Sequence, residues 1–116
     1  MSQADGLFCK IVNEEMDADV VYRDDDVVAF RDINPQAPTH VLVVPRKHVA
    51  TINDLESDDA ATVGALFLAA KEIAAAEGLA ANGYRVTMNC MEGAGQSVFH
   101  IHLHVLGGRS FSWPPG

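Results

Sequence analysis

Three histidines alternate with apolar residues near the end of the chain, in the stretch "SVFHIHLHVLGG". They are His100, His102 and His104. In an extended strand, successive side chains point to opposite faces, so these imidazoles are expected to share one face. Ionisable rings are costly to bury without partners, and such clusters mark functional sites more often than simple packing. The pattern therefore predicts a site of chemistry on this strand.

Two kinds of chemistry remain open for the cluster. Three imidazole nitrogens can hold a catalytic zinc ion. Alternatively, one histidine can attack a phosphorus centre without a metal, while its neighbours orient it and carry charge. Metal-binding histidines usually have carboxylate partners, and this strand offers none. The adjoining "GAGQS" is typical of an anion site built from main-chain amides and a hydroxyl, which favours phosphate over metal.

Short apolar runs with turn residues between them predict the strands that position the histidines. "VVYRDDDVVAFRDI" predicts two strands joined by an acidic turn at residues 24–26. The loop "NPQAPTH" leads into "HVLVVP", which is apolar on both faces and therefore expected in the centre of a sheet. "GYRVTMN" and "FHIHLHVL" predict two further strands.

One long helix is expected at residues 57–78, with Ser57 as its N-cap and Gly78 as its C-terminal stop. Several strands with one long helix, and no repeated strand–helix–strand unit, indicate an α+β domain with a mainly antiparallel sheet. The length of 116 residues predicts a single domain, residues 1–116. Apolar residues at helical spacing predict one buried helix face, formed by Val63, Leu66, Phe67, Ala70, Ile73 and Ala74.

The overall composition restricts the partners and the compartment. A net charge of −8 argues against non-specific binding to nucleic acid or to an anionic membrane surface. The sequence lacks a signal-peptide pattern and a membrane-length apolar run, so we expect a cytoplasmic protein whose Cys9 and Cys90 are free thiols. Val86 and Met88 are expected to need further cover, which a homodimer that continues the sheet across a two-fold axis would provide.

Longer stretches of the sequence resemble the histidine triad (HIT) nucleotide-binding proteins of the phosphoramidase branch. The matching segments are "FCKIV", "FRDINPQAPTHVLVVPRKHV", "GYRVTMN" and "GQSVFHIHLHVLGGR…WPPG", so the resemblance runs from Leu7 to Gly116. It implies a HIT-like fold with a five-stranded sheet, one long helix, a short N-terminal helix and a homodimer. It also implies a metal-independent hydrolase, without a cofactor, that cleaves the P–N bond of adenosine or guanosine 5′-phosphoramidates. AMP-lysine and aminoacyl-adenylates are related substrates.

The resemblance implies a separate role for each catalytic position. His102 would be the nucleophile that forms a nucleotidyl-histidine intermediate. His104 would hold the phosphate oxygens, and Ser97 would assist the leaving amine. His100 and His40 would form a relay that fixes the tautomer of His102.

The resemblance also implies how a purine nucleotide would bind. Asp32 would accept hydrogen bonds from the ribose hydroxyls, and Trp113 would reach the site of the partner subunit. The phosphate site would be lined by Asn89, Gly95 and Gln96. The apolar pocket for the base would be formed by Leu7, Phe8, Ile11, Phe30 and Ile33.

One departure from the resembled pattern concerns a structural zinc site. Many bacterial relatives carry C-x-x-C near the N-terminus, but here the first of these positions is Gly6 and only Cys9 remains. Because the thiolate pair is missing, we expect no structural zinc. His48 is then expected to be a surface residue rather than a remnant ligand.

Two other functions compete with the phosphoramidase. A dinucleoside polyphosphate hydrolase of the same superfamily would carry glutamine near Ser97, so the serine in "GQSV" argues against it. A nucleotide-binding module with vestigial catalysis would tolerate substitutions in the catalytic set, yet all of those positions are filled.

Overall fold

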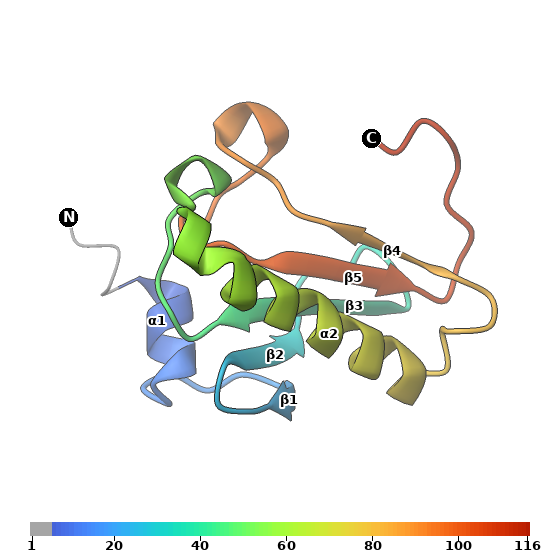
Figure 1. Cartoon of the computed structure of the whole chain (residues 1–116). Coiled ribbons are helices and arrows are strands. Elements are labelled where there is room, and N and C mark those ends of the chain that lie inside the picture. Colours follow the sequence, from blue (N-terminus) through green and yellow to red (C-terminus); the bar gives the residue numbers. More distant parts are fainter. Residues whose placement is uncertain (1–5) are drawn as a thin grey trace.

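A single antiparallel sheet forms the centre of the protein, and the computed structural model describes residues 6–116 of it (Figure 1). The strand order is β1-β2-β3-β5-β4, so β3 is central, as its apolar sequence predicts. The strands are β1 (Val20–Arg23), β2 (Val27–Arg31), β3 (Thr39–Pro45), β4 (Tyr84–Thr87) and β5 (Leu103–Gly107). The α-helices are α1 (Leu7–Val12) and α2 (Ala60–Ala76), and the 3₁₀ turns are η2 (Ile52–Asp54), η3 (Ser57–Asp59) and η4 (Glu92–Ala94).

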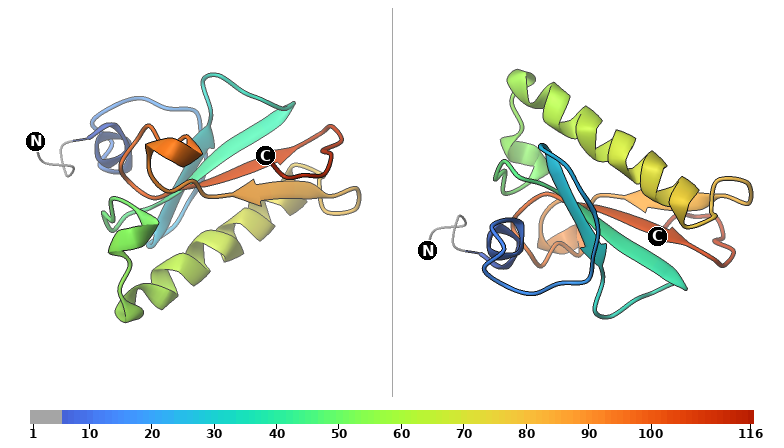
Figure 2. Two further views of the ribbon diagram at one scale, coloured as in Figure 1. Left: turned by 90° about the horizontal axis from the view of Figure 1, so that it is seen from above. Right: turned by 90° about the horizontal axis from the view of Figure 1, so that it is seen from below.

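The two helices lie on opposite faces of the sheet (Figure 2). Alternate side chains of the central strands therefore belong to two separate cores. The core beneath α2 contains Val41 and Val43, whereas the core beneath α1 contains Leu42 and Val44. Because the register pairs Leu42 with His104, the third histidine lies on the α1 face of the sheet.

The long helix is shorter than its sequence pattern predicts. Ser57 is not its N-cap, because the chain first makes the 3₁₀ turn η3 and enters α2 at Ala60. The Asp59 carboxylate accepts the N–H of Glu56 at 2.9 Å in a capping box at the start of η3, and α2 itself begins without a side-chain cap. Gly78 ends the helix as expected: its φ of +76° suits a residue without a β-carbon, and Leu79 N–H donates to Ala74 O.

The expected apolar face of this helix is wrong at one position. Phe67 is half exposed, whereas Leu66 is fully buried. The buried positions recur three and four residues apart, and Phe67 lies about 100° around the helix from Leu66, at the edge of this face. The buried side chains of α2 are Leu66, Ala69, Ala70, Ile73 and Ala74.

Val86 of the edge strand β4 and Met88 just beyond it are half-buried and pack against the core beneath α2. Each keeps part of its surface exposed, so the expectation that both need further cover stays a prediction. None of the helices in the described part of the chain has the length and apolar character needed to cross a bilayer.

Candidate active site

The histidine run lies where the chain enters β5. Hydrogen bonding makes β5 a strand only from Leu103 onward, so His100 and His102 precede it rather than belonging to it. The alternation of faces nevertheless persists, because Ile101, Leu103 and Val105 all join the core beneath α2. The histidines therefore face the α1 side, where the Phe8 ring lies 6.2 Å from that of His100 and 4.9 Å from that of His102.

A main-chain carbonyl determines the tautomer of His102. His102 Nδ1 lies 2.8 Å from His100 O, and a carbonyl oxygen can only accept, so Nδ1 carries the proton. Burial lowers the pKa of His102, and the His100 carbonyl and the Asp32 charge oppose this shift in part. His102 is therefore a neutral imidazole near pH 7, and its unprotonated Nε2 is available as a nucleophile.

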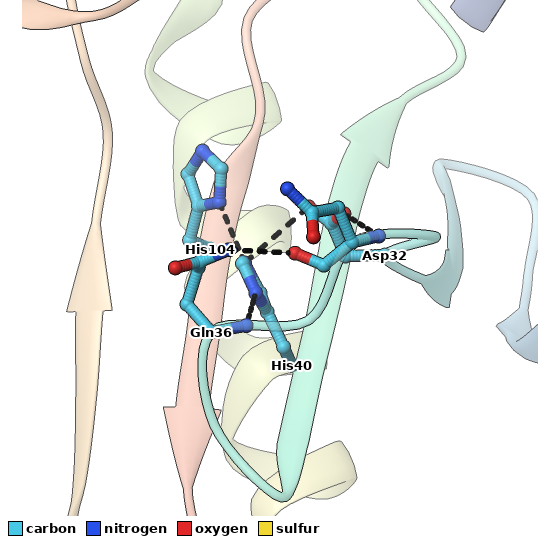
Figure 3. Close-up of polar contacts among 5 residues, drawn as sticks. Asp32, Gln36, His40 and His104 are labelled. Atoms are coloured by element: carbon cyan, nitrogen blue, oxygen red, sulfur yellow. Dashed lines mark hydrogen bonds and ion pairs between the residues drawn. The ribbon is translucent and has the colours of Figure 1, made fainter.

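His104 and His40 form a directly hydrogen-bonded pair (Figure 3), with His40 Nε2 lying 2.9 Å from His104 Nδ1. Gln36 N–H donates to His40 Nδ1 at 3.0 Å, so that nitrogen is unprotonated and His40 Nε2 is the donor of the pair. His104 then accepts at Nδ1 and carries its own proton on Nε2.

The charge state of this pair follows from its surroundings. Burial, assisted by the neighbouring His102 and His40, lowers the pKa of His104 to about 4. Burial also lowers the pKa of His40, which the nearby Asp32 opposes in part. Both rings are consequently neutral near pH 7, and His104 presents an N–H donor.

The hydrogen-bond relay expected from His40 and His100 to His102 differs from the structure at both residues. His40 hydrogen-bonds His104 and not His102, and it reaches the site from β3, where it pairs with Leu106 of β5. His100 does support His102, but through its main-chain carbonyl rather than its ring.

The ring of His100 points away from the other two. Its Nε2 donates to Pro45 O at 2.8 Å, so its Nδ1 is the unprotonated nitrogen. That nitrogen lies 3.4 Å from Cys9 Sγ and 3.1 Å from His48 Nδ1. Burial lowers the pKa of His100 to about 4, and the ring is only 2% exposed. The expectation that His48 is a simple surface residue is wrong, because its ring packs against His100.

Cys9, His48 and His100 have part of the donor set of a structural zinc site. One donor atom from each lies within 4.8 Å of the others. Thiolate and imidazole are zinc ligands, but structural zinc sites almost always have four protein ligands. The position of the second thiolate is Gly6 at the start of α1, so these residues fit such a site incompletely.

A second cluster of donor atoms consists of Asp32, His40 and His104. A metal there would need the lone pair of His40 Nε2. That requires a proton on Nδ1, where Gln36 N–H already donates. The hydrogen-bond polarity therefore favours the direct histidine pair over a bound cation.

Three amides of the loop that was expected to cradle an anion are engaged within the loop itself. The amides of Ala94, Gly95 and Gln96 donate to main-chain carbonyls of the same loop, Met91 O and Glu92 O. The side chain of Gln96 is buried, accepts from Met91 N and donates to Ala50 O and Val98 O. Gln96 therefore shapes the loop.

The other predicted phosphate residues surround this loop. Ser97 is exposed directly after Gln96, and Asn89 is half-buried at the end of the segment that follows β4. A β-carbon added at Gly95 would lie 4.0 Å from Asn89 Nδ2, so these two residues are neighbours.

An apolar cleft of about 590 Å³ opens beside α1. All six residues predicted for the base and ribose line this cleft: Leu7, Phe8, Ile11, Phe30, Asp32 and Ile33. The fully exposed Ile33 can contribute only at the rim. The sequence analysis missed the remaining lining residues, which are Met16, Asp17, Ala18, Asp19, Arg31 and Leu42. For Leu42, the alternation in β3 was an available signal.

Asp32 lies between this cleft and the histidine pair. One carboxylate oxygen accepts the N–H of Asn34 at 2.8 Å, and the other lies 3.5 Å from His40 Nε2. The first contact is the turn-forming role of an aspartate before Asn34-Pro35. The second makes Asp32 part of the electrostatics of His40, His102 and His104.

Trp113 is not brought to the histidines of its own chain. Its side chain is 84% exposed, and it lines a different cleft, of about 1070 Å³, between β4 and the C-terminal segment. Two groups at the site that no residue pattern reveals are the His100 carbonyl and the Gln36 amide. Both belong to the main chain.

Comparisons with known proteins agree with this fold. The HIT domain family matches residues 13–111. The purine nucleoside phosphoramidase of Escherichia coli K12 is 48% identical over 103 residues, which are 89% of this chain and 87% of the relative. The crystal structure of a HIT family hydrolase from Legionella pneumophila Philadelphia 1 is 54% identical with a TM-score of 0.94, and the match covers 97% of this chain and all of the other. A histidine triad nucleotide-binding protein from Candida albicans is 27% identical with a TM-score of 0.81, over 95% and 83% of the two chains. The chain therefore belongs to the HIT family.

Proposed function

We propose that this protein hydrolyses purine nucleoside 5′-phosphoramidates through a covalent intermediate on His102. The observation that carries the proposal is the hydrogen bond from His102 Nδ1 to His100 O, which leaves Nε2 with a free electron pair. The 48% identical relative is a purine nucleoside phosphoramidase, which supports this class of substrate.

The first step forms a nucleotidyl-histidine. His102 Nε2 attacks the phosphorus, and the P–N bond breaks with its electron pair passing to the amine nitrogen. The modified ring then carries a positive charge, which its Nδ1–H shares with the His100 carbonyl. A hydrogen bond already present before the reaction stabilises this charge without reorganisation.

The leaving amine needs a proton to depart as a neutral molecule. The exposed hydroxyl of Ser97 supplies it and regains a proton from solvent. In the second step, water attacks the phosphorus and the Nε2–P electron pair returns to His102. The water's protons reach the phosphate and the solvent, so the net reaction consumes one water and yields a nucleotide and an amine.

The hydrogen-bonded pair of His104 and His40 binds the phosphate. His104 Nε2–H donates to a non-bridging oxygen, with His40 behind it. Phosphoryl-type transfer depends mainly on positioning and on stabilising charge at these oxygens. Because the Ala94, Gly95 and Gln96 amides are engaged within their loop, this neutral N–H and the side chain of Asn89 are the donors that we assign to phosphate.

The nucleoside occupies the apolar cleft. A purine packs among Phe8, Ile11 and Phe30, and the ribose hydroxyls donate to Asp32. The lining is predominantly apolar with one carboxylate beside the histidines, which is typical of small-molecule sites. AMP, GMP and their phosphoramidates, including AMP-lysine and aminoacyl-adenylates, are the ligand class that we propose.

We further propose that the active form is a cytoplasmic homodimer. Among the described residues, the sheet order leaves one edge of β4 without a neighbouring strand, and the exposed Trp113 lines a cleft together with β4. A second copy added at β4 would continue the sheet and cover Trp113. Sedimentation equilibrium at micromolar concentration tests this, since a monomeric mass contradicts it.

The direct test of the function is steady-state hydrolysis of adenosine 5′-phosphoramidate by the wild type and by His102→Ala, with and without EDTA. We expect AMP and ammonia from the wild type in both conditions, and no turnover from the variant. Mass spectrometry after an acid-free quench should detect an adduct of one AMP on the wild type.

The alternatives predict different results. A dinucleoside polyphosphate hydrolase would prefer diadenosine polyphosphates over the phosphoramidate. A binding module would bind AMP without turnover. A zinc hydrolase would lose its activity in EDTA, which would overturn the metal-independent mechanism.

A further inference from the structure

The main chain of Gln36 joins the histidine pair to the C-terminal segment. Its N–H donates to His40 Nδ1 at 3.0 Å, and its carbonyl accepts from Arg109 Nε, also at 3.0 Å. Figure 3 shows the first of these contacts, with the Gln36 amide directed at the ring of His40. One residue of the loop between β2 and β3 therefore touches both groups.

The contact with the Gln36 amide determines which nitrogen of His40, and then of His104, carries the proton. A main-chain amide can only donate, so Gln36 N–H keeps His40 Nδ1 unprotonated. A neutral His40 must then donate from Nε2, and His104 must accept at Nδ1. The proton of His104 is consequently on Nε2. Without the amide, either ring could reverse its tautomer, and His104 would then present a lone pair instead of a donor.

The segment that carries Arg109 is held firmly against the same loop. A β-carbon at Gly108 would lie 2.8 Å from Pro38 Cβ, and Gly108 has a φ of +88°, so only glycine permits this approach. The Arg109 guanidinium lies 4.2 Å from the Phe111 ring centre and also donates to Ser110 O. These contacts point Nε at the Gln36 carbonyl.

We propose that Gln36 and Arg109 are positioning residues for the histidine pair: Arg109 holds the Gln36 main chain, and the Gln36 amide sets the tautomers of His40 and His104. The contact is charge-assisted and lies at the surface, and both residues are exposed. We expect the fold to be independent of the Arg109–Gln36 contact, whereas the tautomers of His40 and His104 depend on it. The catalytic part of this inference rests on the proposed function, because it assigns phosphate binding to His104 Nε2–H.

A matched control exists within the same segment. Arg85 lies 5.0 Å from the Phe111 ring centre and donates to Ser112 O and Pro115 O. It therefore holds the same tail as Arg109, but it hydrogen-bonds the tail and not Gln36. Substituting each arginine with methionine keeps much of the aliphatic length and removes every donor.

The experiment compares wild type, Arg109→Met, Arg85→Met and Gln36→Ala by two-bond ¹H–¹⁵N correlation of the imidazole rings at pH 7. In the wild type we expect protonated Nε2 and unprotonated Nδ1 for both His40 and His104. Arg109→Met should move both rings toward mixed tautomers. Gln36→Ala retains the amide and should match the wild type, as should Arg85→Met.

Kinetics provide the second readout. Loss of one charge-assisted hydrogen bond shifts an equilibrium by about three- to tenfold, so we expect kcat of Arg109→Met to fall by about that factor. KM should change less, because the base and ribose contacts are untouched. Melting temperatures should stay close to that of the wild type.

The outcomes separate this inference from the proposed function. Unchanged His40 and His104 spectra in Arg109→Met overturn it, and so does an equal effect of Arg85→Met, which would assign the change to tail packing. Altered spectra in Arg109→Met, in a protein whose wild type does not hydrolyse the phosphoramidate, would uphold the positioning role and overturn the proposed function.

Discussion

The two faces of the central sheet are formed by the same strands, but one face is an apolar core and the other carries the candidate active site. The face beneath α2 is filled by apolar side chains, among them Val41, Val43 and Leu66, which are fully buried. The face beneath α1 is apolar only at Phe8, Phe30 and Leu42 and their neighbours. Beyond the short helix it carries His40, His102 and His104.

The difference between the faces follows from the lengths of their helices. The 17 residues of α2 can cover one face, whereas the six residues of α1 cover only part of the other. The uncovered part is accessible to a ligand, yet its burial lowers the pKa of His102 and His104 enough to keep both rings neutral near pH 7. A single strand can therefore contribute core side chains to one face of the sheet and active-site side chains to the other.

The largest effect should come from the face beneath α1. His102→Ala removes the nucleophile, and we expect kcat to fall by at least about a thousandfold. The free energy of unfolding should fall by only about 1–2 kcal/mol, because the buried ring loses its contact with Phe8 and its hydrogen bond to His100 O. Phosphoramidate turnover and urea unfolding measure the two quantities. Substantial residual activity would mean that another group attacks the phosphorus.

A substitution beneath α2 should show the opposite profile. Leu66→Ala leaves a cavity in a fully buried position and should cost about 3 kcal/mol of unfolding free energy, with kcat of the folded protein unchanged. Phe67→Ala is the matched control: its half-exposed ring should cost much less. A large loss of kcat in folded Leu66→Ala would show that the two faces are not independent.

Acidification should destabilise the protein through the histidine face. The pKa of His100 is about 4 when folded and about 6.5 when unfolded, so the unfolded state binds more protons between these values. Stability is therefore fully present above pH 6.5 and is lost as the pH falls toward 4. For this buried ring the loss is about 3 kcal/mol, from 2.5 pKa units.

Urea midpoints between pH 7 and pH 4.5 measure this effect. His100→Gln, whose amide can still donate to Pro45 O, should have a shallower dependence on pH. Equal slopes in the variant and the wild type would assign the acid sensitivity to other groups.

The smallest effect should follow metal removal. Because residues 6–116 bring together only three of the usual four zinc ligands, dialysis against EDTA is expected to leave the melting temperature unchanged. Cys9→Ala provides the control. A melting temperature that falls in EDTA and recovers with Zn²⁺ in the wild type, but not in Cys9→Ala, would show that Cys9, His48 and His100 hold a metal.

Most of the sheet could be predicted from the sequence, because its strands have strong local signals. The acidic turn at residues 24–26 does lie between β1 and β2, and the doubly apolar β3 is indeed central. The start of α2 was harder to predict. Ser57 has the residue type of a cap, but the chain places a 3₁₀ turn, closed by the hydrogen bond from Glu56 N–H to Asp59, before the α-helix begins.

The candidate site was predictable in its residue types but not in its connections. Phe8, Phe30 and Asp32 line one cleft, whereas their binding of a nucleotide stays a prediction. The pairing of His40 with His104, and of His48 with His100, joins residues 64 and 52 positions apart. Which rings meet depends on strand register and side-chain direction, which local patterns do not specify.

The sequence by itself determined the alternation of the histidines, the apolar runs that become the central strands, and the family. These are local properties of side-chain type and spacing. Only the tertiary structure decided which nitrogen of His102, His40 and His104 carries the proton. That choice rests on two main-chain groups, the His100 carbonyl beside His102 and the Gln36 amide beside His40, and every residue has such groups. Their position relative to a ring exists only once the chain is folded.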